Sequence, residues 1–257
     1  ARELLAVRSP LDAELLVSEM LGTWWGPRTR RVGLRGHARI DGIEELVGEG
    51  LVEYAAQQAT PAALALLSGI ACLGTPAQAA MAERAALDLI ERGIARPRWA
   101  DHLGAVTSGD CFLNSDAYGD RDEVVCVFSY AGEEPHALVA VVDYNANGLL
   151  RDGWVTAQVG RLLDQCRQIH AGDSGAGGSF GPLDPAQARR MLARALRVTY
   201  DSADPPVSES FPSYHAFIRA RIRTLPPRGG EPARTGAAGT ADRAGRQPWS
   251  GDRRAML

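Results

Sequence analysis

Residues 111–148, CFLNSDAYGDRDEVVCVFSYAGEEPHALVAVVDYNANG, decide the fold class of this chain. Three runs within the stretch are rich in β-branched and aromatic side chains, a composition typical of strands. They are Cys111 to Ala117, Val124 to Tyr130 and His136 to Tyr144. Short segments that contain glycine or proline separate the runs and suit turns. We therefore predict a three-stranded antiparallel β-meander.

The residues before the meander carry signals for helix starts. At three sites a side chain that can cap a helix precedes a proline, which is favoured at the first helical position. These sites are Ser9-Pro10, Thr60-Pro61 and Thr75-Pro76. The last of them adds Gln78, which completes the pattern of a capping box. With a further helix expected over residues 42–58, we predict that the amino-terminal half is helical.

Helical patterns return after the meander. A helix is expected from about Val155 to His170, and a Gly/Ser-rich loop follows over residues 172–182. Asp184-Pro185 repeats the capped start with proline, and the last helix is expected from Tyr214 to Leu225. Helices therefore flank the meander, and the predicted fold class is α+β.

We predict one domain over residues 1–225 and a separate tail over residues 226–257. The domain divides into a helical part, the meander with its helix, a loop and the closing helices, at residues 1–105, 106–171, 172–182 and 183–225. The tail has six arginines, three acids and almost no large apolar residue, so burial cannot offset the entropy of ordering it. We predict that the tail is basic and disordered.

The composition excludes several classes of protein. All 28 residues counted as Lys or Arg are arginines, so Schiff-base enzymes and P-loop proteins that need a lysine are excluded. The four cysteines lie far apart without a C-x-x-C pair, which gives no support for a zinc site. Ala62 to Leu73 is the longest apolar stretch, too short to span a bilayer, and no secretory leader is visible. We expect a soluble, cytoplasmic protein with no membrane partner.

Acidic residues gather around the predicted turns of the meander. Asp143, Asn145, Asn147 and Gly148 match the first half of a calcium loop, but Trp154 stands where the loop needs a bidentate glutamate. If the hairpin places Asp143 beside Glu123, several loop carboxylates converge at one end of the sheet. The candidate metal ligands are Asp120, Asp143, Asn145 and Asp152. The alternative is that these loops are simply acidic and solvated.

Two further groups have a functional and a structural interpretation. His136, at the start of the third run, is a candidate catalytic base together with Asp143, or a hydrogen-bonded histidine beside a turn. Trp24 and Trp25 precede five arginines and could stack nucleic-acid bases, or they belong to the core. These arginines are Arg28, Arg30, Arg31, Arg35 and Arg39. Arg219, Arg221 and Arg223 of the last helix are expected to form a solvated face.

Several segments resemble a family of uncharacterised actinobacterial proteins. They are Arg96 to Trp99, Tyr118 to Asp120, Phe128 to Asp143 and Asn145 to Asp152. The resemblance covers about residues 1–225, and a GC-rich genome would explain the lack of lysine. It implies one structural unit, and it implies no activity and no residue role.

The sequence supports three hypotheses about function. The first is a non-enzymatic interaction or regulatory module that binds a protein partner, because no complete catalytic signature is visible. The second is a cation-dependent, hydrolase-like enzyme that uses the carboxylates at the sheet end, with a divalent cation as its cofactor. The third is nucleic-acid binding through Trp24, Trp25 and the following arginines.

Overall fold

The computed structural model describes residues 2–23, 25, 43–172 and 178–227. Before the sheet it contains four α-helices and two 3₁₀ helices. Their bounds are η1 Arg2–Leu5, α1 Pro10–Gly22, α2 Ile43–Gln58, α3 Pro61–Leu73, α4 Pro76–Glu91 and η2 Arg98–Asp101. The helical amino-terminal half is thus confirmed.

The helices begin where the capping residues predict. Ser9 Oγ accepts hydrogen bonds from the backbone N–H groups of Leu11 and Asp12, at 3.1 and 3.4 Å. Thr75 and Gln78 form both bonds of the capping box, at 3.0 and 3.3 Å. Each bond satisfies a backbone donor that the first turn of a helix leaves without a partner.

The meander is part of a larger antiparallel sheet. Its five strands lie in the order β4-β3-β2-β1-β5. Their bounds are β1 Val106–Ser115, β2 Arg121–Tyr130, β3 Glu133–Asp143, β4 Leu149–Thr156 and β5 Ser179–Leu183. The α+β class is confirmed, but the expected count of three strands is wrong because the two edge strands were missed.

Both missed strands contain residues that are uncommon in strands. In β4, the central Arg-Asp-Gly of residues 151–153 interrupts the apolar run. The strand continues to Thr156, so the following helix begins at Val159 and not at Val155 as predicted. The β5 strand lies partly inside the segment predicted as a Gly/Ser-rich loop. Its Pro182 has no N–H to donate, which an edge strand tolerates.

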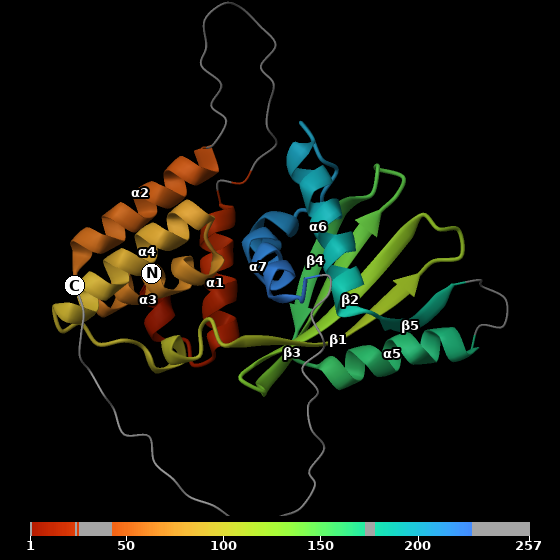
Figure 1. Ribbon diagram of the computed structural model, residues 1–257, viewed down its shortest axis with the longest axis horizontal. Helices are drawn as coiled ribbons and strands as arrows, with labels where there is room; N and C mark the ends of the chain where they lie inside the picture. The colour runs from red at the N-terminus through yellow and green to blue at the C-terminus, as the bar shows by residue number, and fades with distance from the viewer. Residues whose placement is uncertain (1, 24, 26–42, 173–177, 228–257) are drawn as a thin grey trace, which may run out of the picture.

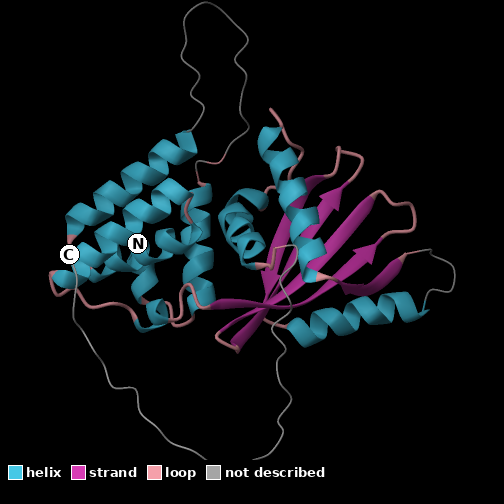
Figure 2. Ribbon diagram, in the orientation of Figure 1, coloured by secondary structure: helices cyan, strands magenta, loops and turns pink. Residues whose placement is uncertain are grey.

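Helices cover both faces of the sheet (Figures 1 and 2). One face packs against α5, Val159–Gly172, through Val125, Ala137 and Val139. The other face packs against α6, Pro185–Asp201, and α7, Phe211–Thr224. This second face builds the larger apolar core, which contains Phe128, Leu138 and Ile218 among others.

The α7 helix joins the sheet to the helical half. It packs closely along α1, where Ser18 Oγ donates to the carbonyl of Ser213 at 2.7 Å and accepts from the N–H of Phe217 at 3.1 Å. A Cβ atom on Gly22 would lie 1.8 Å from the carbonyl oxygen of Pro212, so only glycine fits there. Side chains of α7 therefore face both halves of the molecule.

Some predictions fall outside the described residues. These are the order of the tail beyond Pro227, and the roles of Trp24 and the five arginines that follow Trp25. Among the residues that the structure describes, none of the helices has the length and apolar character needed to cross a membrane.

Candidate functional site

The register of the central hairpin places the sheet-end acids differently from the prediction. Asp143 lies opposite Arg121 on β2, whereas Glu123 lies opposite Val141. The difference arises at the turn, where Ala131 and Gly132 both have positive φ, at 52° and 89°, so that β3 begins directly after two turn residues. Such a two-residue turn matches the twist of a hairpin. Together with the register irregularity between Phe128 and Tyr130, it shifts the expected pairing by two residues.

Two of the four candidate metal ligands, Asp143 and Asp152, already use their carboxylates to bind other parts of the protein. Asp143 pairs with Arg151 at 2.8 Å through Oδ2, and its Oδ1 accepts from the backbone N–H of Asn145 at 3.0 Å. Asp152 Oδ1 instead accepts from the hydroxyls of Ser208 and Ser210, in the segment before α7. Asp143 and Asp152 therefore serve two separate local structures.

The turn between β1 and β2 contributes backbone contacts to this sheet end. The carbonyl of Asp120 accepts from the N–H of Tyr144 at 2.9 Å, which brings the two turns together. Asp122 accepts hydrogen bonds from Ser115 Oγ at 2.6 Å and from the Tyr144 hydroxyl at 2.5 Å. Nowhere in the described part of the chain do three His, Cys, Asp or Glu residues form a group suited to a metal ion.

A substitution at Asp143 tests the hypothesis of a cation site. We expect Asp143→Asn to lower the free energy of unfolding by about 0–1 kcal/mol, because the pair with half-exposed Arg151 is lost while the amide oxygen still accepts the turn bonds. Millimolar calcium or magnesium should leave the melting temperature of both forms unchanged, since Arg151 already neutralises the carboxylate. A cation-dependent rise in the parent chain that disappears in Asp143→Asn would restore the metal hypothesis.

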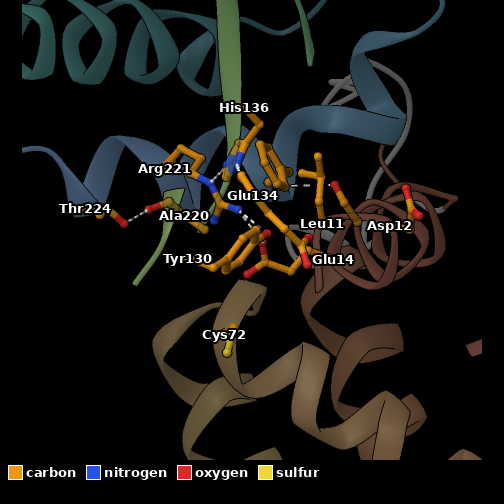
Figure 3. Close-up of polar contacts among 12 residues, drawn as sticks. Leu11, Asp12, Glu14, Cys72, Tyr130, Glu134, His136, Ala220, Arg221 and Thr224 are labelled. Atoms are coloured by element: carbon orange, nitrogen blue, oxygen red, sulfur yellow. Dashed lines mark hydrogen bonds and ion pairs between the residues drawn. The ribbon is translucent and has the colours of Figure 1, made fainter. Parts of the chain in front are cut away.

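A second polar cluster lies buried at the junction of the helical half and the sheet (Figure 3). Arg221 of α7 is 1% exposed and ion-paired through Nη2 with Glu14 of α1. The same Nη2 donates to the hydroxyl of Tyr130 on β2 at 2.7 Å, and that hydroxyl donates to Glu14. Arg221 Nε donates to His136 Nε2 on β3 at 3.1 Å. One guanidinium thus connects two helices and two strands.

Aromatic rings enclose the guanidinium of Arg221. Its carbon atom lies 4.0 Å from the ring centroid of Phe217 and 5.5 Å from that of Tyr130. Ring faces attract a cation that has been removed from water. The expectation of a solvated face is therefore wrong for Arg221. Arg219 is half-buried and donates to the carbonyl of Leu73 at 3.0 Å, whereas Arg223 is exposed, as expected, and lies 3.4 Å from the carbonyl of Cys72.

His136 is a fully buried member of this cluster. Since Arg221 donates to its Nε2, the proton resides on Nδ1, which donates to the carbonyl of Glu134 at 3.2 Å. Burial, helped by the charge of Arg221, lowers the pKa of His136 to about 4. The ring is therefore neutral at pH 7, and its only lone pair is engaged by Arg221.

Other reactive side chains near the junction are also held in their neutral forms. Burial, together with the charge of Glu14, raises the pKa of Cys72 to about 11. Burial likewise raises the pKa of Tyr130 far above its usual range. On the sheet, a hydrogen bond with Cys111 and burial raise the pKa of Cys126. A thiol must ionise to act as a nucleophile, so these cysteines are unreactive at neutral pH.

Trp25 belongs to the core. Its ring meets Phe211 edge-on at 5.2 Å between centroids and lies 6.0 Å from the ring of His215. The side chain is half-buried and packs against the apolar core of the sheet. The interpretation of this tryptophan as a base-stacking residue loses support, whereas Trp24 lies outside the described residues.

A cavity bounded by described residues lies in the helical half. Its volume is about 540 Å³, and its walls come from η1, α1, α2, α3 and the residues that connect them. Leu21, Leu51, Ala55 and Leu66 supply apolar walls. A second, smaller pocket of about 360 Å³ lies beside the buried cluster and is lined by Glu14, Arg221 and Arg223, among others. The sequence did not predict either one.

Comparisons with protein-family models, with curated proteins and with solved structures find no match to this chain. The resemblance to the actinobacterial family therefore stays a prediction.

Proposed function

We propose that the chain is a non-enzymatic binding module and that its ligand site is the cavity between α1, α2 and α3. The observation that carries the proposal is the cavity itself, with a volume of about 540 Å³ and mainly apolar walls. Sites for small molecules commonly have a volume of about 300–1,000 Å³, apolar walls and few polar groups. The cavity has this size and this character.

The state of the titratable groups also favours binding over catalysis. A general base needs a free lone pair and a pKa near the working pH. The lone pair of His136 is engaged by Arg221, and its pKa is about 4. Cys72 is protonated, and Asp143 is neutralised by Arg151. These side chains maintain structure, which leaves the cavity as the better candidate for function.

A substitution that fills the cavity tests the proposal. Ala62 is a half-buried residue of α3 that lines the cavity, and Ala80 is an exposed residue of α4 that does not. We expect the uncharged fluorescent probe N-phenyl-1-naphthylamine to bind the parent chain with enhanced emission. Ala62→Phe should weaken this binding by about tenfold or more, because the added ring occupies space that the probe needs. The loss of apolar contacts between probe and wall then costs about 1.4 kcal/mol or more of binding free energy.

Ala80→Phe is the matched control and should bind the probe as the parent does. Melting temperatures of both variants establish that they are folded. The proposal fails if the parent chain does not enhance the emission, or if the two variants bind the probe equally well.

A further inference from the structure

We infer that the cavity accommodates an amphiphile with one anionic head group, such as a medium-chain carboxylate. The inference rests on the proposed function and adds the chemical class of the ligand. It depends on three properties of the walls: their apolar surface, the sign of their charge and the position of a helix terminus.

The apolar part of the walls suits an aliphatic or aromatic body. Three helices contribute apolar side chains to the lining: Met20 and Leu21 of α1, Leu51 of α2 and Leu66 of α3. Burial of apolar ligand surface against such side chains stabilises a complex in proportion to the area removed from water. These contacts favour a chain or ring over a polar solute.

Among the described residues, the one charged side chain that lines the cavity is positive. Arg2 of η1 is exposed there, and it forms neither an ion pair nor a hydrogen bond within the described part of the chain. The described residues that line the cavity include no aspartate or glutamate. Other guanidinium groups of the described chain, such as those of Arg151 and Arg221, already pair with carboxylates. Arg2 is therefore available to a carboxylate brought by a ligand, which it can bind through two parallel hydrogen bonds.

The amino terminus of α3 adds to this positive potential. Thr60, Ala62 and Ala63 line the cavity, and they form the cap and first turn of this 13-residue helix. The first turn of a helix carries a partial positive charge, which favours an anion nearby. Arg2 and the helix terminus act in the same direction, so an anionic head group is preferred over a neutral or a cationic one.

Three amphiphiles with the same ten-carbon chain test the inference by displacement of N-phenyl-1-naphthylamine. We expect decanoate to displace the probe at a concentration at least tenfold below that of decanol, and decyltrimethylammonium to be the weakest. Arg2→Gln should raise the concentration of decanoate needed by about tenfold and leave that of decanol unchanged. Arg8→Gln, at an exposed arginine outside the cavity, is the matched control and should leave all three unchanged.

The outcomes separate the inference from the proposed function. If the three amphiphiles displace the probe equally, or if Arg2→Gln weakens decanoate and decanol alike, the anionic class is wrong while the cavity remains a binding site. If the parent chain does not bind the probe, the proposed function and the inference both fail.

Discussion

Arg221→Met is expected to lower the free energy of unfolding by about 3–5 kcal/mol, because it leaves a buried carboxylate without its cation. The side chains of Arg221 and Glu14 are each 2% exposed, so water cannot replace the missing partner. Tyr130 and His136 lose a hydrogen-bond donor at the same time. Urea unfolding at pH 7, followed by circular dichroism, measures the loss.

A double variant separates the cost of the orphaned charge from the value of the pair. We expect Glu14→Leu combined with Arg221→Met to recover most of the stability, since apolar residues often replace a buried ion pair at little cost. Arg92→Met is the surface control: its partner Asp88 is 64% exposed, and the loss should stay below about 1 kcal/mol. A double variant as unstable as Arg221→Met alone would show that the loss comes from packing or from the lost bonds to Tyr130 and His136, and not from the unpaired charge.

The sequence predicts the elements whose signals are local. A helix start needs only a capping side chain and a proline within a few residues, which is why Ser9, Thr60 and Thr75 mark the starts correctly. The β3 strand is buried on both faces, so its apolar run stands out. The β4 and β5 strands lie at the edges of the sheet, where exposure permits Arg151 and Pro182. Their assignment depends on pairing with distant strands.

The site depends on contacts that no local pattern encodes. The sequence predicts a solvated face for Arg221 because one face of a helix is normally exposed. In this molecule α7 lies between the sheet and α1, so the face that would meet water meets Glu14 and Tyr130 instead. His136 is the one residue whose position in the sequence indicates the buried cluster, since a histidine within an apolar strand needs a hydrogen-bond partner. The cavity arises from the packing of separate helices and had no such signal.

Two buried histidines should make the fold sensitive to acid. Burial and the charge of Arg221 lower the pKa of His136 to about 4, and burial and the charge of Arg219 lower that of His215 to about 3. In the unfolded chain both return to about 6.5. Below pH 6.5 the unfolded chain therefore binds more protons than the folded one, and the stability contributed by the neutral rings is lost as the pH falls.

The surroundings of each ring explain why protonation is resisted in the fold. His136 meets Arg221 from α7 and the ring of Tyr130, 5.2 Å away, and its Nδ1 donates to a backbone carbonyl. His215 lies 3.2 Å from the Tyr200 hydroxyl of α6 and packs on Phe211. Within the described part of the chain, the polar and ring contacts of His136 include no carboxylate that would stabilise an imidazolium.

The expected loss is about 1.4 kcal/mol per pH unit for each histidine below pH 6.5, and it continues to about pH 4 for His136 and to about pH 3 for His215. Urea unfolding between pH 7 and 5 measures the slope in a range where ordinary carboxylates remain ionised. His136→Gln should remove about half of that slope, because Gln does not titrate. His102→Gln, at an exposed histidine, should leave the slope unchanged.

A free energy of unfolding that does not change between pH 6.5 and 5 would mean that both histidine rings accept protons in the folded protein. That result would contradict the role of Arg221 as the hydrogen-bond donor to His136.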